Sequence, residues 1–438
     1  MDVLIMAAQL ILSLTILVFV HEMGHFLAAK AFGIKVEKFY IFFDAWGKKL
    51  FSFKRGETEY GIGWLPLGGY VKIAGMVDES MDKEAMAAEP QPWEFRSKPA
   101  WQRLIVMIGG IVMNIILGII IYTFYLSFYS QQYLPNSELQ ESGVFVYEAG
   151  EELGFEQGDW IVAVNGKEVE RYKDIRSPKF FFGSTVTVVR DGEEMDIKLP
   201  GNLFKQLSSP LFDPMYQSVY FQQFSETSLN VDAALEPGDR FMKIGETEIQ
   251  NFKQFSDSLK AHKDSELSFT MLRGEESFDI ELLIDTSGLI GFQPDVRLDD
   301  YYQMEAYTMG KAFKFGLKDA VNTLVLQVLG FSKLFSGDVD PRESVASPIG
   351  IAKLFGSTWQ WDRFWLMTAL ISMILAFMNF LPIPALDGGH IVFLLIEIVR
   401  GKPVSEKVLE KAQIVGMILL LTLMVFAVGN DILKGFGI

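Results

Sequence analysis

The chain has 438 residues, half of them hydrophobic, and a formal net charge of −16. This composition is typical of a membrane-embedded or unusually core-rich protein, and the length leaves room for a membrane part and about two small domains. The acidic balance argues against nucleic acid as a partner. The absence of cysteine excludes disulfides, thiolate nucleophiles and thiolate metal ligands.

Residues 1–32 are predicted to form a first transmembrane helix. No charge occurs from Val3 to Val20, and about 20 apolar residues span a bilayer core as a helix. No Lys or Arg precedes Lys30, so the basic region of a signal peptide is missing. Basic residues follow the helix, and the positive-inside rule therefore predicts an outward-facing N-terminus and a cytoplasmic C-terminal end.

The sequence His21-Glu22-Met23-Gly24-His25 lies late in this apolar run. Positions i and i+4 share one helix face, so His21 and His25 can bind one metal ion, usually zinc. Glu22 beside them can act as a general base toward water. A chance match, or two interfacial histidines bonded to backbone, is the alternative. Only four histidines occur in the chain, and two of them share this motif inside an apolar helix, which favours the metal site.

Residues 33–100 are predicted to be a β region, with strand-like pieces at 36–43, 50–53, 59–65 and 70–73 separated by glycines. These pieces indicate β-hairpins that are too apolar for an ordinary wet loop. Non-helical backbone enters a membrane only where protein or a water cavity satisfies it. We therefore expect a re-entrant β-element that dips toward the metal site from the cytoplasmic side, with an ordinary cytoplasmic β-subdomain as the alternative.

Residues 101–128 are predicted to be the second transmembrane helix, running outward. Gly109, Gly110 and Gly118 would allow close helix contact. Asn114 is the polar exception, and we expect it to bond to a neighbouring helix.

Residues 129–300 are acidic and contain an internal repeat. Gly158-Asp159 and Gly238-Asp239 each begin a short strand, followed by a helical piece and a strand pair with a tight turn. The offset of about 80 residues is the size of one small domain, which predicts tandem domains at 129–220 and 221–300. The pattern resembles PDZ domains, which bind extended peptides by strand addition. Two β-domains that act only as steric spacers are the alternative.

The last third of the chain contains two further predicted spans. Residues 301–360 are expected to be an amphipathic helix at the outer interface and a linker, with a true span as the alternative. Residues 361–399 are predicted to be the third transmembrane segment, and residues 412–438 the fourth helix. The third segment contains the run from Asn379 to His390, NFLPIPALDGGH, in which two prolines should break the helix. A broken helix with a buried carboxylate is one way a membrane protein builds a site.

Three side chains of this segment are candidates for a third metal ligand, because catalytic zinc takes three protein ligands. Topology places Asp387 at about the depth of His21 and His25. Glu397 is expected to pair with Arg400 at the i, i+3 spacing, and His390 is expected to support the turn. Asp387 is therefore favoured.

Together these motifs resemble the site-2 protease family, and the segments Leu65–Lys72 and Lys98–Arg103 are similar to its bacterial branch. The resemblance covers essentially the whole chain. It implies an intramembrane zinc metalloprotease in which His21, His25 and Asp387 bind zinc. Glu22 would be the general base, and Asn379 would contact the substrate backbone or the developing oxyanion.

The resemblance also implies how substrates bind. An unwound substrate would pair with a strand next to the site, and the candidate substrate-binding residues are Gly68, Gly69, Tyr70, Val71, Lys72, Pro382 and Pro384. Substrates would be single-span proteins already shortened outside the membrane, such as anti-sigma factors, and remnant signal peptides. The PDZ-like pair would exclude uncut substrates. The location would be the bacterial inner membrane, with the PDZ-like domains periplasmic and the active site toward the cytoplasm.

The predicted fold class is a polytopic α-helical membrane protein with four transmembrane helices, a membrane-associated β-element and two tandem PDZ-like domains. Two departures from the family pattern are visible. Gly110-Ile111-Val112-Met113-Asn114 stands where relatives often read Gly-Pro-x-x-Asn, and Ser347-Pro348 stands where Gly-Pro is common. The rival functions are a membrane-tethered adaptor without catalysis and an ion or proton transporter, although no inverted repeat of broken helices is visible.

Overall fold

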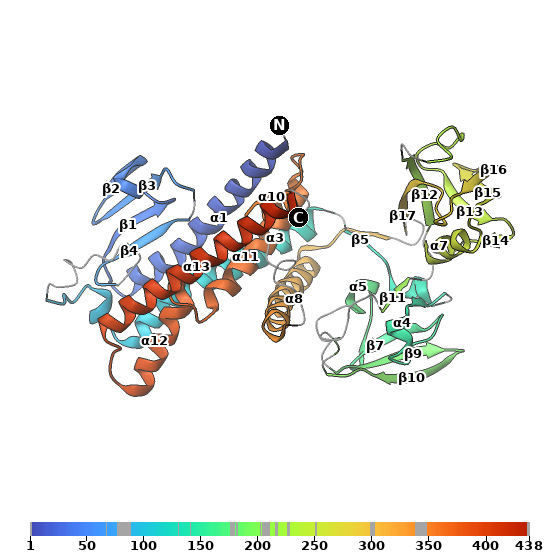
Figure 1. Cartoon of the computed structure of the whole chain (residues 1–438). Coiled ribbons are helices and arrows are strands. Elements are labelled where there is room, and N and C mark those ends of the chain that lie inside the picture. Colours follow the sequence, from blue (N-terminus) through green and yellow to red (C-terminus); the bar gives the residue numbers. More distant parts are fainter. Residues whose placement is uncertain are drawn as a thin grey trace. The chain divides into compact units, whose positions relative to one another are not determined.

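The computed structural model divides the chain into two compact units, Met1–Ser130 with Ala306–Ile438, and Gln131–Glu305. Both units are drawn in Figure 1. The residues that the structure describes are 2–66, 68–76, 89–129, 131–140, 142–175, 180, 183–201, 203, 211–214, 218–225, 228–249, 252–297, 303–337 and 348–435.

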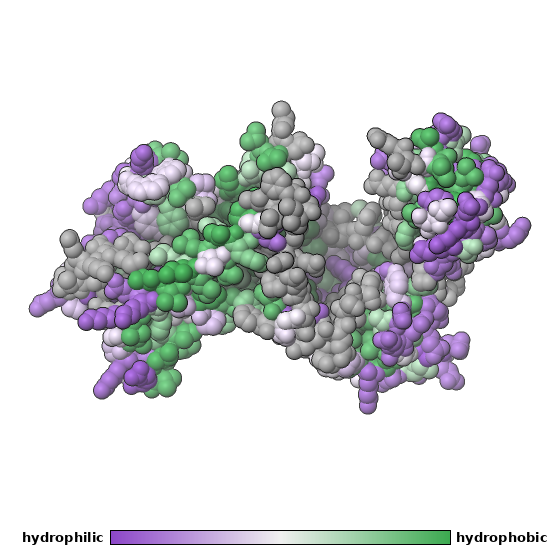
Figure 2. Space-filling model, in the orientation of Figure 1, coloured by the Kyte–Doolittle hydropathy of each residue, from purple (hydrophilic) through white to green (hydrophobic). Residues whose placement is uncertain are grey.

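The first unit is mainly helical. The α-helices of its described residues are α1 (Asp2–Ala31), α3 (Ala100–Phe128), α8 (Met309–Ser336), α10 (Pro348–Phe355), α11 (Trp361–Phe380), α12 (Asp387–Arg400) and α13 (Glu406–Gly435). Among the described residues, four helices, α1, α3, α11 and α13, are long and apolar enough to cross a membrane. Hydrophobic side chains gather along the long helices in Figure 2. The predicted number of four candidate spans is therefore confirmed.

Helix α3 is the centre of this unit and packs against α1, α8, α11 and α12. Glycine permits the closest of these contacts, because a Cβ atom on Gly24 would lie 2.2 Å from the Gly109 carbonyl oxygen. On the other side of α3, a Cβ atom on Gly118 would lie 2.5 Å from the Met373 sulfur. The close helix contacts expected at these glycines are present.

The β region forms one four-stranded sheet of β1 (Val36–Ile41), β2 (Lys49–Arg55), β3 (Thr58–Gly63) and β4 (Tyr70–Ile73). The strand order is β2-β3-β1-β4, so β4 is an edge strand. Only β2 and β3 form a hairpin, whereas β1 lies parallel to β3 with Phe39 opposite Tyr60. One of the expected hairpins is therefore present in the described residues, and the other pairings differ because β3 lies between β2 and β1. The Phe39 ring packs edge-on against Phe19 and Phe26, which attaches the sheet to α1.

The third predicted segment is two helices, α11 and α12, with a break at Leu381–Leu386. Ala385 has a φ of 79° there, a left-handed conformation that is uncommon outside glycine. A Cβ atom on Gly388 would lie 2.0 Å from the Leu381 carbonyl oxygen, and one on Gly389 would lie 2.7 Å from that of Ile383. The two glycines therefore let α12 begin directly against the break that the prolines predict, with Asp387 as its first residue.

Two side-chain contacts bear on the remaining expectations for this unit. Glu397 of α12 pairs with Arg103 of α3 and not with Arg400. The expected pair within the helix is wrong because α12 lies against α3, which brings an Arg from a distant part of the chain to Glu397. Helix α8 lies against α3 and α11, with a 3.3 Å hydrogen bond between the Tyr122 and Thr323 hydroxyls. Whether α8 is interfacial or spans the membrane stays a prediction.

The second unit contains two β-domains with separate cores. The first contains β6 (Val144–Val146), β7 (Trp160–Val164), β8 (Lys167–Glu168), β9 (Thr185–Arg190), β10 (Glu193–Lys198), β11 (Phe212–Pro214), α4 (Glu148–Glu151) and α5 (Tyr172–Ile175). The second contains β12 (Ser218–Phe224), β13 (Arg240–Ile244), β14 (Thr247–Glu248), α7 (Phe252–Ala261), β15 (Ser265–Arg273), β16 (Glu276–Ile284) and β17 (Phe292–Arg297). Strands β5 (Gln131–Tyr133) and β18 (Gln303–Glu305) pair antiparallel where the chain enters and leaves the unit.

The two domains repeat one arrangement of strands. The sheet orders are β10-β9-β7-β8 and β16-β15-β13-β12-β17, with β14 on β13. In each, the strand that follows the Gly-Asp pair is antiparallel to the first strand of the final hairpin, β7 to β9 and β13 to β15. The internal repeat seen in the sequence is therefore a repeat of structure.

The aspartate of each Gly-Asp pair is buried and bonded to the arginine that ends the first strand of the final hairpin, β9 or β15. The Arg190 guanidinium donates to both carboxylate oxygens of Asp159, at 2.7 and 2.8 Å. Arg273 donates to both oxygens of Asp239, each at 2.7 Å. A backbone N–H also donates to each carboxylate, from Glu156 at 2.9 Å and from Glu236 at 2.8 Å. We call this arrangement the Asp–Arg lock.

Candidate metal centre

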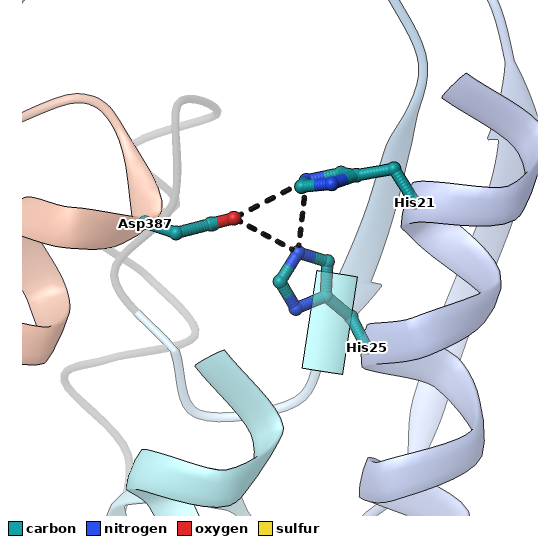
Figure 3. Close-up of side chains that lie close together, drawn as sticks. All are labelled: His21, His25 and Asp387. Carbon is teal, nitrogen blue, oxygen red and sulfur yellow. Dashed lines mark hydrogen bonds and ion pairs between the residues drawn. The ribbon is translucent and has the colours of Figure 1, made fainter. Parts of the chain in front are cut away.

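Three side chains from opposite ends of the sequence meet inside the helical unit. His21 and His25 lie one turn apart on α1, with their Nε2 atoms 3.2 Å from each other. Oδ2 of Asp387, at the start of α12, lies 3.2 Å from His21 Nε2 and 3.3 Å from His25 Nε2 (Figure 3). The structure thus brings together the three residues that the sequence suggested as metal ligands.

The spacing of these three atoms fits a zinc ion. Zinc binds nitrogen and oxygen ligands tetrahedrally at about 2.0–2.2 Å, which separates the ligand atoms by about 3.3–3.6 Å. The three observed separations are 3.2, 3.2 and 3.3 Å. Asp387 Oδ2 is also buried and accepts no hydrogen bond. A cation between the three atoms would satisfy that oxygen, which is costly to bury alone.

A backbone carbonyl fixes the orientation of the His25 ring. His25 Nδ1 lies 2.8 Å from the Val106 carbonyl oxygen of α3. A carbonyl oxygen only accepts, so Nδ1 carries the hydrogen and Nε2 presents a lone pair to the other two candidate ligands. This arrangement suits a neutral imidazole that binds a metal.

The three side chains open onto a cavity of about 690 Å³. Glu22 of α1 and Asn379 of the last turn of α11 line it as well, and the Asn379 amide nitrogen lies 3.4 Å from His21 Nε2. His390 of α12 is a further lining residue. The cavity therefore holds every side chain that the sequence suggested for catalysis.

The candidate substrate strand lies along one wall of the same cavity. Residues 68–72 all line it, and the backbone of Val71 interacts with the Glu22 carboxylate. A Cβ atom on Gly69 would lie 2.6 Å from the Tyr40 carbonyl oxygen and 2.7 Å from Val18, so only glycine allows this approach. Pro382 and Pro384 are not among the cavity-lining residues, and they lie in the break between α11 and α12.

A polar cluster at the cavity wall escaped the sequence analysis. Asp44 accepts hydrogen bonds from Lys38 Nζ at 2.9 Å and from the Tyr70 hydroxyl at 2.8 Å. Burial alone would raise the pKa of Asp44, but these two bonds hold that pKa below its usual value. Burial and the bond to Asp44 raise the pKa of Tyr70, which keeps its hydroxyl protonated. The sequence signal for this cluster was weak, because Lys38 stands beside a second charged residue, Glu37, in the strand.

Asn114 also lies closer to the candidate metal centre than the sequence indicated. It is fully buried, and its amide nitrogen lies 3.2 Å from His21 Nδ1. The expected bond to a neighbouring helix is therefore present, and its partner is one of the two histidines.

Known proteins are similar to this chain over nearly its whole length. Residues 9–423 match peptidase family M50. The regulator of sigma E protease of Haemophilus influenzae is 30% identical over 97% of this chain and 98% of its own length. The regulator of sigma-E protease RseP of Escherichia coli K12 is 30% identical over 97% of each chain. A Neisseria meningitidis relative described as a candidate zinc metalloprotease is 27% identical over 98% of each chain.

Proposed function

This chain belongs to peptidase family M50 and is a metalloprotease, and on that premise we propose that it cleaves transmembrane segments of single-span membrane proteins. Its substrates would already have been cut outside the membrane, as truncated anti-sigma factors and remnant signal peptides are. The observation that carries this proposal is the convergence of His21, His25 and Asp387 within a bundle of membrane-spanning candidates. The location would be a bacterial inner membrane, with an outward N-terminus.

Zinc is the metal that this site would hold, with His21, His25 and Asp387 as its ligands. The ligand spacing and the unpartnered Asp387 oxygen support this assignment. When bound, zinc would supply a Lewis acid for the scissile carbonyl and would make water acidic enough to be activated near neutral pH. A carboxylate ligand also lowers the net charge of a dication in apolar surroundings.

Glu22 would accept the proton of the attacking water and deliver it to the leaving amine. Its position on α1, next to His21 and on the cavity wall, supports this role. The Asn379 side-chain amide would donate a hydrogen bond to the developing oxyanion. Its place at the end of α11, 3.4 Å from His21 Nε2, supports that role.

Strand β4 would hold the substrate in an extended form. A substrate helix hides its carbonyls in i→i−4 hydrogen bonds, so cleavage requires local unwinding. Pairing with an edge strand would replace the lost backbone bonds. Two observations support β4 in this role: it is the last strand of its sheet, and residues 68–72 line the cavity.

The two β-domains of the second unit would be PDZ-like domains that select substrates. The repeated strand order and the repeated Asp–Arg lock support two copies of one fold. Their main role would be to exclude proteins that still carry a folded domain outside the membrane. Strand β17 ends the sheet of the second domain, which makes peptide binding by strand addition the second candidate role.

The decisive experiment compares wild type with Glu22→Gln on a shortened single-span substrate, with zinc measured in both proteins. We expect cleavage to fall by about 10²–10⁴-fold, because the general base is lost, while zinc stays stoichiometric. Glu57→Gln is the matched control, because Glu57 pairs with Lys30 outside the cavity. Equal cleavage by wild type and Glu22→Gln would contradict the proposal and favour a non-catalytic adaptor.

A further inference from the structure

One face of α3 carries three residues at four-residue intervals, Val106, Gly110 and Asn114. On a helix, such positions lie one above another, and each of these three contacts or closely approaches a histidine of the candidate metal centre. We propose that this face of α3 positions both zinc-binding histidines, and that Asn114 is the positioning residue for His21. The inference rests on the proposed zinc site and goes beyond it, because it assigns a role to residues that bind no metal.

The Val106 end of this face orients His25. The Val106 carbonyl accepts a hydrogen bond from His25 Nδ1 at 2.8 Å, and that contact is buried. The carbonyl thereby selects the tautomer in which Nε2 is free to bind a metal. Such a bond from the second nitrogen of a metal-binding histidine raises the basicity of the ligand and fixes its ring.

Gly110 leaves the space in which the two rings lie. A Cβ atom there would be 2.5 Å from His25 Nε2 and 2.6 Å from His21 Cε1. Any side chain at this position would displace the rings from the point at which they meet Asp387. The backbone of α3 at Gly110 therefore packs directly against the two histidine rings of the candidate metal centre.

Asn114 completes the arrangement on the His21 side. Its side chain is fully buried and its Oδ1 atom has no hydrogen-bond partner, while Nδ2 lies 3.2 Å from His21 Nδ1. His21 Nε2 faces Asp387 and would bind the metal, so Nδ1 must carry the hydrogen and needs an acceptor. A half-turn of the amide exchanges its oxygen and nitrogen in nearly the same space. Oδ1 then accepts from Nδ1, which satisfies both atoms.

Ser372 of α11 contacts the backbone of Asn114 and not its side-chain amide. The Ser372 hydroxyl donates to the Asn114 backbone carbonyl at 2.7 Å, and both residues are fully buried. This bond joins α3 to α11 without contacting either histidine. Removing this bond therefore tests the packing of α3 against α11 near Asn114 without removing the contact between the Asn114 side chain and His21.

The experiment measures zinc affinity of the full-length protein by competition with a chelator, and records the visible spectrum of the Co²⁺-substituted protein. Asn114→Leu should bind zinc about 10–100-fold more weakly, because loss of an outer partner of a metal ligand typically costs this much, and its Co²⁺ spectrum should change. Asn114→Asp should retain wild-type affinity within about threefold, since a carboxylate also accepts from Nδ1. If Asn114→Leu is not monodisperse, Asn114→Ala removes the amide without adding bulk.

Ser372→Ala is the matched control and should bind zinc as wild type does. If Ser372→Ala loses as much affinity as Asn114→Leu, the effect is one of helix packing and the inference is overturned. Equal zinc affinity in wild type and Asn114→Leu would overturn the inference alone. Absence of stoichiometric zinc in the wild-type protein would overturn the proposed function as well, so the two failures are distinguishable.

Discussion

The candidate metal centre and the two Asp–Arg locks each contain a buried aspartate, but they differ in the hydrogen bonds that this aspartate accepts. In the locks, Asp159 and Asp239 each accept three hydrogen bonds, two from an arginine and one from a backbone N–H. At the metal centre, Asp387 Oδ2 is buried with no hydrogen-bond donor and faces two histidine nitrogens. A buried carboxylate whose oxygens accept hydrogen bonds fits a structural role, whereas a buried carboxylate oxygen without a donor indicates a site that binds a cation.

The two regions also differ in how far apart their partners lie in the sequence. Asp159 and Arg190 are 31 residues apart and Asp239 and Arg273 are 34 apart, inside one small domain in each case. His21 and Asp387 come from the first and the penultimate helix of the helical unit. The locks can therefore form when one domain folds, while the metal centre needs the assembled bundle. Substitutions at the candidate metal centre should therefore change zinc binding and cleavage, whereas substitutions at the locks should change the stability of the β-domains.

The largest effect is expected for Asp387→Ala. Removal of one of the three proposed ligands should reduce bound zinc well below one ion per chain and abolish cleavage of a single-span substrate. Thermal unfolding of the second unit should stay unchanged, because its locks do not involve this residue. Metal analysis and a cleavage assay measure both quantities. Full zinc occupancy in Asp387→Ala would show that the third ligand lies elsewhere.

Asn379→Ala should have the next largest effect, a fall in kcat of about 10²–10³-fold, which is typical for the loss of one oxyanion donor. Bound zinc should stay at one ion per chain, since Asn379 is not one of the converging ligands. Kinetics with a shortened substrate, together with metal analysis, test this. If Asn379→Ala instead lost zinc but kept its kcat per bound zinc, Asn379 would position His21 for metal binding and would not donate to the oxyanion.

Breaking the locks should affect stability and leave cleavage of a shortened substrate intact. Asp159→Ala should lower the free energy of unfolding of its domain by about 3–5 kcal/mol, as expected for a buried ion pair that loses one partner. Asp239→Ala should cost less, about 1–3 kcal/mol, because the Arg273 side chain is 40% exposed and the Arg190 side chain only 18%. Hydrogen exchange of the strand amides in the full-length protein measures the two losses.

The repeat offers a matched control for this comparison. Asp196 and Asp279 accept exposed cross-strand hydrogen bonds, each at 2.8 Å, from Thr187 and Thr270 respectively. Replacement of either aspartate by Ala should change domain stability by no more than about 0.5 kcal/mol. A larger loss at these exposed positions than at the locks would contradict the distinction between buried and exposed carboxylates.

The smallest expected effect is a pH dependence of the second β-domain. Burial alone would raise the pKa of Asp239, but the Arg273 guanidinium and the Glu236 N–H hold that pKa below its usual value. Since the pKa is lower in the folded than in the unfolded state, the lock stabilises the domain above about pH 4, the ordinary pKa of Asp, and loses this contribution as the pH falls further. Denaturant unfolding from pH 6 to pH 2 should show it, and Asp239→Asn should flatten the curve.

Local patterns in the sequence predicted much of this protein. Apolar runs gave the four candidate spans, and the two prolines with the two following glycines gave the break that places Asp387 at the start of α12. The i, i+4 spacing gave the shared face of His21 and His25. The repeated Gly-Asp pairs gave two domains of one strand order. Each of these features depends on residues that are near one another in the chain.

Long-range partners could not be predicted in the same way. Glu397 has Arg400 within helical reach, yet it pairs with Arg103 because α12 packs on α3. The parallel pairing of β1 with β3 depends on the path of β2, which no local residue pattern reveals. The cluster of Lys38, Asp44 and Tyr70 likewise depends on how a loop returns to its sheet.

By itself, the sequence determined the candidate spans, the break, the repeat and the residue types of the candidate metal centre, because hydrophobic periodicity, backbone stereochemistry and ligand chemistry act over short segments of chain. Only the tertiary structure decided which face of α3 lies under the two histidines, and that Asn114 contacts His21. The physical reason is that helix packing fixes these contacts. A single glycine pair, Gly24 with Gly109, lets α1 and α3 approach closely enough for residues from distant parts of the chain to meet at the candidate metal centre.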